Sequence, residues 1–191
     1  ILMLADKADG GGDFPKDSND IAGLFAPGYP MQLIYLKDYQ LEQARTALFD
    51  GMNQGTRYIN YIGHGTVDRF SEGGLLTKDD AAGLTNTVYP VMTALTCSSG
   101  HYALAGFDSL MEALLIRNGG GIVSSWAPSD WSYNADAKTL GEGFYKAALQ
   151  PEVLTLGDAV RKSMDAYRAA GRASYELNIF NVLGDPALRL K

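Results

Sequence analysis

Two side chains in this sequence are suited to act together as a nucleophile and a base. Cys97 is the one cysteine of the chain and follows an apolar run, and His64 follows an earlier apolar run. A thiol becomes a strong nucleophile when it loses its proton, and a neighbouring imidazole can take that proton. Gly65 has no side chain, so its backbone N–H can approach a reacting carbonyl oxygen and form an oxyanion hole with the N–H of Cys97. These residues predict the acyl-transfer chemistry of a cysteine hydrolase.

Apolar runs of strand length alternate with segments of helical periodicity along the chain. Strands are expected at 1–5, 31–36, 58–62, 91–96, 121–126 and 187–190, and helices near 18–25, 39–53, 77–80, 109–117, 135–149 and 156–170. This alternation predicts an α/β fold in which about six strands form a mostly parallel sheet between two layers of helices. Ligand sites in such sheets lie at the carboxyl ends of the strands. His64 and Cys97 follow successive strands, so they are expected to meet at that edge.

Composition limits the classes of protein. With 191 residues, of which 46% are hydrophobic, the chain has enough apolar material for one globular core, so residues 1–191 are interpreted as a single domain. A net charge of -6 argues against nucleic acid as a partner. No run approaches the ~18 apolar residues of a transmembrane segment. Four acidic residues on predicted helices are interpreted as solvated: Glu112, Glu142, Asp158 and Glu176.

Other interpretations of the reactive residues remain open. A cysteine at the end of a strand is often a small buried hydrophobe, and a histidine between two glycines is often a turn residue. A metal site formed by Cys97, His64 and His101 is a third interpretation. The chain has only these three soft ligands and no Cys-x-x-Cys pattern, which argues against metal.

Four segments together resemble the gingipain family of cysteine peptidases. They are residues 61–65 (YIGHG), 94–100 (ALTCSSG), 119–123 (GGGIV) and 183–188 (LGDPAL). Each motif is short, and their order and spacing make the combination specific. The resemblance implies a caspase-like sandwich in which His64 and Cys97 form the catalytic dyad, with the N–H groups of Gly65 and Cys97 as oxyanion donors. It also implies a protein or peptide substrate, no required cofactor, and secretion or attachment to a bacterial cell surface.

The resemblance further implies a lobe that precedes this one. Gingipain-type catalytic regions usually contain an earlier α/β lobe, and this chain is expected to begin at the first strand of the second, caspase-like lobe. An acidic group that orients the histidine is among the residues such a lobe would contribute, and none is assigned in this sequence.

Arginine-cleaving members of the family suggest a substrate pocket. There the P1 side chain is held by an acidic residue that enters the first helix and by a tryptophan beyond the strand that follows the cysteine. By spacing, Asp13 and Trp131 resemble those two positions. A carboxylate pairs with a guanidinium, and an indole face stacks on it. Ile62 and Leu95, at the ends of two strands, are also expected to contact the substrate.

Calcium is a further expectation. Gingipain-like proteins are stabilised by calcium, and Asp6, Asp9 and Asp13 with their intervening glycines offer oxygen ligands for a hard cation, although their spacing does not fit an EF-hand.

The resulting hypothesis is a cysteine endopeptidase that hydrolyses peptide bonds through a Cys97 thioester, with His64 as general acid and base. Two alternatives remain open. One is a sortase-like transpeptidase of the same fold, in which an amine instead of water resolves the thioester. The other is a noncatalytic caspase-like binding module.

Overall fold

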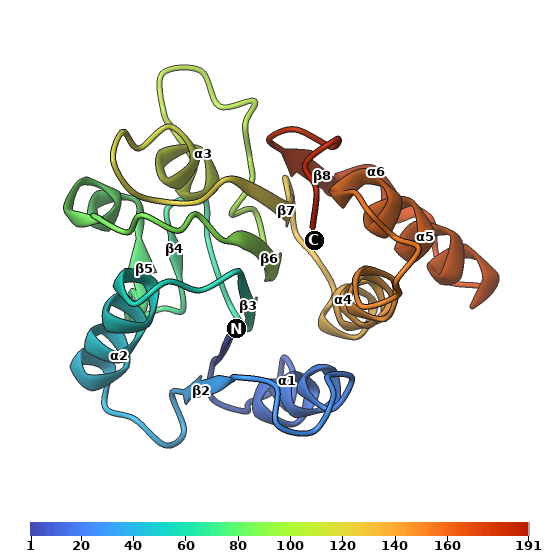
Figure 1. Cartoon of the computed structure of the whole chain (residues 1–191), viewed down its shortest axis with the longest axis horizontal. Helices are drawn as coiled ribbons and strands as arrows, with labels where there is room; N and C mark the ends of the chain where they lie inside the picture. The colour runs from blue at the N-terminus through green and yellow to red at the C-terminus, as the bar shows by residue number, and fades with distance from the viewer. Residues whose placement is uncertain (191) are drawn as a thin grey trace.

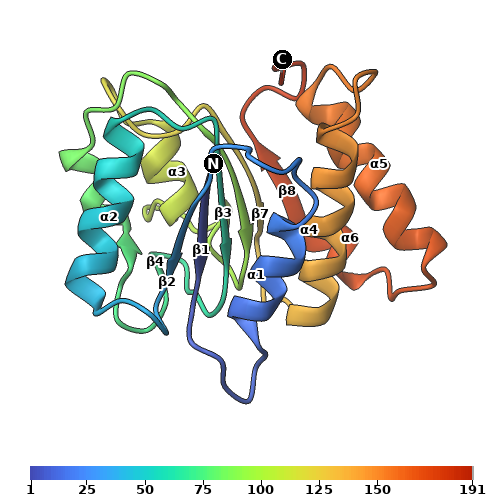
Figure 2. The same cartoon turned by 60° about the horizontal axis from the view of Figure 1, so that its bottom comes forward.

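A six-stranded sheet lies at the centre of the molecule (Figures 1 and 2). The computed structural model describes residues 1–190. The strands of the sheet, in the order β2-β1-β3-β6-β7-β8, are Gln32–Tyr35, Leu2–Ala5, Tyr58–Ile62, Val91–Leu95, Ser124–Pro128 and Phe180–Leu183. Neighbours from β2 to β7 pair in parallel, and β8 runs antiparallel to β7. The predicted mostly parallel sheet is therefore confirmed.

Helices cover both faces of this sheet, as Figure 2 shows. They are α1 (Phe14–Ala22), α2 (Leu41–Asn53), α3 (Leu110–Leu115), α4 (Asn134–Ala148), α5 (Leu156–Ala169) and α6 (Tyr175–Ile179). One apolar core joins the sheet to α1, α4 and α5, and a second joins its other face to α2 and α3. Successive residues of β1 alternate between the two cores, with Met3 in the first and Leu4 in the second. Because a strand buried on both faces has no polar side, it appears in the sequence as a continuous apolar run.

A small hairpin and a 3₁₀ helix follow β3. The hairpin consists of β4 (Arg69–Phe70) and β5 (Leu76–Thr77), which pair antiparallel, and the 3₁₀ helix η1 covers Lys78–Gly83. Thr77 caps η1 in a capping box with Asp80, as the pattern at 77–80 predicts. The hairpin itself was not predicted, because its strands are only two residues long.

The final strand predicted from the sequence is wrong. Residues 187–190 form no strand of the sheet and contribute only an isolated bridge between Arg189 and Thr155. The sixth strand is β8, which follows α6 without an intervening loop. The apolar residues of α6 and β8 merge into one run, so periodicity alone does not separate the short helix from the strand.

The first helix begins at Phe14, earlier than the predicted start at residue 18. Asp13 is its N-cap: the Asp13 side chain accepts a hydrogen bond of 3.2 Å from the backbone N–H of Lys16. Pro15 is tolerated here because the first turn of a helix needs no N–H donor.

No helix within residues 1–190 is long and apolar enough to cross a membrane.

Candidate active site

The proposed dyad lies at the carboxyl edge of β3 and β6. These two strands are parallel neighbours whose last residues, Ile62 and Leu95, are paired in register. His64 and Cys97 each come two residues later, so both loops leave the sheet at the same level. The backbone N–H of Gly63 donates to the Leu95 carbonyl at 3.3 Å, which continues the pairing into the loops.

Gly65 lets the histidine loop contact the segment that carries the cysteine. A Cβ atom at position 65 would lie 2.4 Å from Oγ1 of Thr96 and 3.2 Å from the Arg69 carbonyl oxygen, so a larger residue does not fit without a shift of this contact. The bridge between Gly65 and Phe70 does not use the Gly65 amide. Within residues 1–190, neither the Gly65 nor the Cys97 amide donates a hydrogen bond to another residue. Both predicted oxyanion donors are therefore free.

One cavity of about 310 Å³ contains both members of the dyad. Its lining residues are Gly11, Phe14, Gly63, His64, Leu95, Thr96, Cys97, Trp131, Ser132, Tyr133, Asn134 and Ala137. Of the predicted substrate contacts, Leu95 and Trp131 line this cavity, and Trp131 is 78% exposed. Ile62 is buried in the core, and Asp13 caps α1 instead of lining the cavity.

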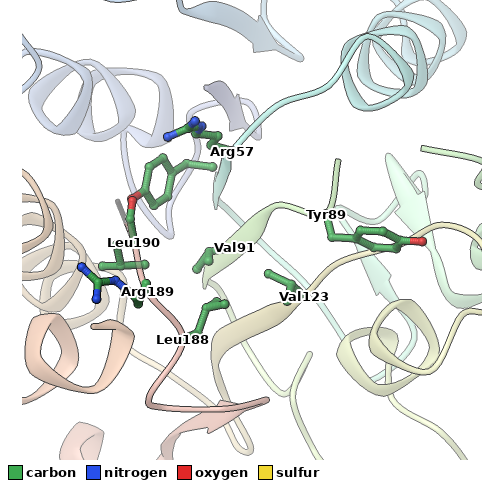
Figure 3. A pocket seen from close by; sticks show the side chains of 8 residues that line it. Arg57, Tyr89, Val91, Val123, Leu188, Arg189 and Leu190 are labelled. Atoms are coloured by element: carbon green, nitrogen blue, oxygen red, sulfur yellow. The ribbon is translucent and has the colours of Figure 1, made fainter. Parts of the chain in front are cut away.

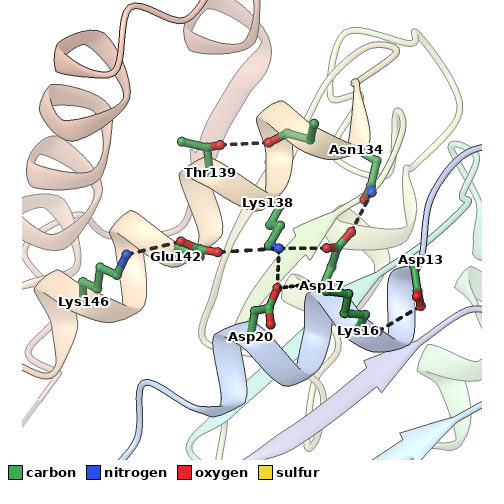
Figure 4. Close-up of polar contacts among 10 residues, drawn as sticks. Asp13, Lys16, Asp17, Asp20, Asn134, Lys138, Thr139, Glu142 and Lys146 are labelled. Atoms are coloured by element: carbon green, nitrogen blue, oxygen red, sulfur yellow. Dashed lines mark hydrogen bonds and ion pairs between the residues drawn. The ribbon is translucent and has the colours of Figure 1, made fainter.

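The wall of this cavity between α1 and α4 is held by polar contacts (Figure 4). Asn134 donates from Nδ2 to Oδ2 of Asp17 at 2.8 Å, and Lys138 pairs with the other Asp17 oxygen at 2.8 Å. Oδ1 of Asn134 is buried and has no hydrogen-bond partner in residues 1–190. Asn134 lines the cavity, but this oxygen itself is covered by the surrounding residues.

His64 has a carboxylate partner within this chain. Its Nε2 lies 2.8 Å from Oδ2 of Asp9, while Oδ1 of Asp9 accepts a 2.7 Å hydrogen bond from the Gly11 amide. The Gly11 hydrogen bond, followed by that of His64, lowers the pKa of Asp9. The rings of Phe14 and His64 pack edge to face, with their centroids 5.1 Å apart. No orienting acid is assigned from the sequence, and Asp9 reaches this position because β1 lies next to β3.

A hydrogen bond from Tyr61 fixes the backbone of His64. The Tyr61 hydroxyl donates to the His64 carbonyl at 2.6 Å and accepts from the Ser71 amide at 3.0 Å. Tyr61 is fully buried, and this burial raises its pKa well above the usual range, so the hydroxyl stays a neutral donor.

The sulfur of Cys97 lies against the backbone of Ser132. The thiol donates to the Ser132 carbonyl at 3.6 Å, and the Ser132 amide donates to Sγ at 3.4 Å. Directly after the cysteine, Ser98 has a left-handed φ of 50°, and its amide donates to the Asp130 carbonyl at 2.9 Å. The cysteine loop is therefore pinned to residues 129–133, which connect β7 to α4.

The three acidic residues expected to bind calcium have separate partners. Asp6 accepts from the amide of Lys7, and Asp9 and Asp13 accept from Gly11 and Lys16 as described above. In the part of the chain that the structure describes, no three histidine, cysteine or acidic side chains gather in a metal-binding group. Calcium binding stays a prediction from the resemblance.

A different cavity, of about 380 Å³, lies at the opposite edge of the sheet (Figure 3). It is lined by Arg57, Tyr58, Tyr89, Val91, Val123, Leu188, Arg189 and Leu190. Tyr58 and Val91 begin β3 and β6, so this cavity is at the amino ends of the strands. Its lining contains no cysteine, histidine or carboxylate, in contrast to the cavity of the dyad.

Solved structures of gingipains have the same fold. The chain is similar to gingipain R (RgpB), described as an Arg-specific cysteine proteinase, with a TM-score of 0.83 and 22% identity. It is also similar to a complex of the pro- and mature domains of Porphyromonas gingivalis RgpB, with a TM-score of 0.84 and 21% identity. In both comparisons the match covers 98% of this chain and 47% of the other, so this chain spans about half the length of these relatives. No curated protein sequence matches it.

The sequence model of Peptidase family C25 matches residues 1–191, which is the whole chain. This match agrees with the gingipain-like fold and with the strand-end positions of the histidine and cysteine loops. The chain belongs to peptidase family C25.

Proposed function

We propose that this chain hydrolyses peptide bonds through a thioester on Cys97, with His64 as general acid and base. The observation that carries this proposal is the shared cavity: His64 and Cys97 line it together, and Asp9 holds the imidazole of His64. Membership of a cysteine peptidase family supports the same reaction class.

The acylation step uses the dyad and the two free amides. Cys97 gives its proton to His64, and the sulfur attacks the carbonyl carbon of the scissile peptide bond. The negative charge that forms on the carbonyl oxygen is stabilised by the N–H groups of Gly65 and Cys97. The C–N bond then breaks, and His64 gives the proton to the departing amine. The products of this step are a Cys97 thioester and a shortened peptide with a new amino terminus.

Deacylation repeats the sequence with water. His64 takes a proton from water, the resulting oxygen nucleophile attacks the thioester carbon, and the C–S bond breaks. The sulfur regains its proton from His64, and the new carboxyl terminus leaves. Asp9 keeps one imidazole nitrogen hydrogen-bonded throughout, which fixes the ring orientation and stabilises its charged form.

Covalent labelling tests this proposal. Peptidyl acyloxymethyl ketones with Arg, Lys or Leu at P1 are incubated with the folded protein, and intact mass reports the label on Cys97. We expect wild type to be labelled and His64→Ala to be labelled much more slowly. His101→Ala is the matched control, because His101 is the other histidine of the chain and does not line the dyad cavity.

Folded wild type that takes no label with any of the three reagents would contradict the proposal and favour a noncatalytic binding module. Equal labelling of wild type and His64→Ala would remove the histidine from the mechanism while leaving the cysteine reactive.

Hydrolysis and transpeptidation share the thioester, so labelling does not separate them. Digestion of a peptide in the presence of added glycine amide does: hydrolysis gives a free carboxyl terminus, and transpeptidation gives the amide product. We expect the free carboxyl terminus.

The comparisons also support a partner on the amino-terminal side. One similar structure is a complex between pro- and mature domains of RgpB, and the chain covers 47% of that relative. We therefore infer that an amino-terminal lobe or pro-domain packs on this lobe, and that the protein acts outside the cell, as the resemblance implies.

A further inference from the structure

Glu176 is a buried carboxylate beside the site that the proposed reaction does not use. Its residue is 1% exposed, which contradicts the expectation that it is solvated. Its Oε2 accepts from the Ser132 hydroxyl at 2.8 Å, and its Oε1 accepts from the Tyr133 amide at 2.8 Å. Burying a carboxylate is costly unless hydrogen bonds replace its hydration, so these two contacts make the buried position tolerable.

The antiparallel direction of β8 brings Glu176 to this place. Phe180, the first residue of β8, pairs with Pro128, the last residue of β7. Because α6 ends directly before β8, it lies at the same edge of the sheet as the dyad loops.

Residues 129–133 are consequently bonded to α6 at both ends of the segment. At the first end, the amide and hydroxyl of Ser129 donate to the Ile179 carbonyl at 2.8 and 3.1 Å. At the other end, Ser132 and Tyr133 donate to Glu176. We call residues 129–133 the cysteine-facing loop, because Ser132 contacts the Cys97 sulfur.

Ser132, the residue of this loop that contacts the Cys97 sulfur, is one of the two residues that Glu176 holds. The Ser132 amide donates to Sγ of Cys97 at 3.4 Å, and a donor at this position favours the thiolate. The Ser132 carbonyl, which accepts from the thiol at the longer distance of 3.6 Å, favours the thiol, so the position of Ser132 sets the balance between the two. Trp131, immediately before Ser132, lines the cavity, whereas Glu176 does not line it. Glu176 thus acts on the sulfur only through the loop.

The charge of Glu176 matters for this arrangement. Both of its oxygens accept hydrogen bonds, which the ionised carboxylate does best. Burial raises the pKa of Glu176, and the hydrogen bonds from the Tyr133 amide and the Ser132 hydroxyl oppose that effect. A glutamine at this position has the same shape but no charge. With its oxygen at the Tyr133 amide, its NH2 group would donate to the Ser132 hydroxyl, which reverses that hydrogen bond and leaves both bonds neutral.

We propose that Glu176 is a positioning residue that sets the reactivity of Cys97 by holding the Ser132 amide against the sulfur. This inference rests on the proposed function, because it concerns the same nucleophile. No residue of α6 belongs to the dyad or lines the cavity, so this inference gives α6 an indirect role in the site.

The test is alkylation of Cys97 by iodoacetamide, measured as a function of pH by intact mass. For Glu176→Gln we expect an alkylation rate about tenfold lower near neutral pH, the size of effect that follows from replacing two charge-assisted hydrogen bonds by neutral ones. We also expect the midpoint of the rate-against-pH profile to move to higher pH, because a Ser132 amide held less firmly against the sulfur favours the thiolate less.

The matched control is Asp80→Asn. Asp80 is a partly buried carboxylate on η1 that pairs with Arg45 of α2, so its loss destabilises the fold without touching the cysteine-facing loop. We expect Asp80→Asn to leave both the rate and the midpoint at the wild-type values. If it changes them as Glu176→Gln does, the effect is one of general stability and the inference is wrong.

Ser132→Ala serves as a second variant if Glu176→Gln does not fold. It removes the hydroxyl bond to Glu176 and retains the amide at the sulfur, so we expect a smaller decrease of about threefold. A folded Glu176→Gln, or failing that Ser132→Ala, with the wild-type rate and profile overturns the inference.

This outcome is distinguishable from failure of the proposed function. Wild type that resists the peptidyl ketones but is alkylated by iodoacetamide would contradict the peptidase proposal. The comparison among the variants would still decide the role of Glu176.

Discussion

Two residues of this chain contact the imidazole of His64, and a third holds its backbone. Asp9 accepts at Nε2, the Phe14 and His64 rings pack edge to face, and the Tyr61 hydroxyl donates to the His64 carbonyl. A Cβ at Gly11 would approach Cε1 of His64 to 2.9 Å, so the loop before α1 also needs a small residue there. About half of the His64 side chain stays exposed, so the hydrogen bond to Asp9 is the main contact that orients the ring.

We expect Asp9→Asn to lower kcat/KM by roughly 10- to 100-fold, because an amide neither stabilises the imidazolium nor fixes the same tautomer. The lowered pKa of Asp9 keeps it ionised at neutral pH, and its bond with His64 is lost only as the pH falls through that lowered value. Steady-state kinetics on a peptide substrate measures the effect. Asp6→Asn is the control, since Asp6 lies in the same loop and does not contact His64; an equal loss in both variants would exclude the orienting role.

The predicted role of Asp13 in binding a basic P1 residue can be tested separately from its role as the N-cap of α1. Asn caps a helix as well as Asp does, so Asp13→Asn removes the charge and keeps the start of α1. If Asp13 pairs with a basic P1 residue, the ratio of Arg-substrate to Leu-substrate turnover should fall by about tenfold. An unchanged ratio shows that Asp13 is only a cap, which is the role its 3.2 Å bond to the Lys16 amide already gives it.

At the scale of elements, the hairpin after His64 is attached to both the site and α2. Phe70 of β4 stacks on Tyr61 at a centroid distance of 4.1 Å, and the Gly65–Phe70 bridge joins the hairpin to the histidine loop. On the far side, Arg45 of α2 makes a two-pronged contact with Asp80 of η1, at 2.7 and 3.1 Å. Stability of this unit therefore depends on an ion pair that is largely buried.

We expect Asp80→Asn to reduce the free energy of unfolding by about 2 kcal/mol at neutral pH, since it breaks a charge-assisted pair. Burial raises the pKa of Asp80, but the hydrogen bonds from Arg45 and Thr77 outweigh burial and lower it overall. A lowered folded pKa means that the contribution is present above the unfolded value of about 3.9 and is lost as the pH falls through the folded value. Urea unfolding at several pH values should show the difference between wild type and variant shrinking in acid; a difference that persists there would mean that the ion pair is not its source.

For the whole molecule, the site forms where segments far apart in the sequence meet at one edge of the sheet. The loop after β1, the loops after β3 and β6, and the cysteine-facing loop after β7 all contribute lining residues to one cavity. The two apolar cores on either side of the sheet fix the strands from which these loops leave, so His64 and Cys97 each lie two residues beyond the end of a rigid strand.

Calcium binding is tested by the stability of the whole molecule. The carboxylates of Asp6, Asp9 and Asp13 each accept from a different backbone amide, and the three do not gather in one group within residues 1–190. If calcium binds as the resemblance implies, EDTA should lower the melting temperature, and added calcium but not magnesium should reverse the decrease, because a ligand that binds only the folded state stabilises it. An unchanged melting temperature would contradict the calcium prediction.

Local patterns predicted most of the elements. The central strands β1, β3 and β6 are buried on both faces and therefore stand out as apolar runs, and the long helices have one buried face that repeats at helical spacing. The positions of His64 and Cys97 after such runs, together with the rule that parallel strands place their carboxyl ends at one edge, predicted where the two residues would lie.

The partners of those residues were decided only by the tertiary structure. Asp9 meets His64, 55 positions away, because β1 is inserted between β2 and β3, and nothing in the local pattern fixes that order. Glu176 looks like a solvated helix residue in the sequence and is buried because β8 turns back along β7 and carries α6 to the site. Periodicity reports which face of an element is apolar, whereas the neighbour that covers this face depends on strand order and direction, which are properties of the folded sheet.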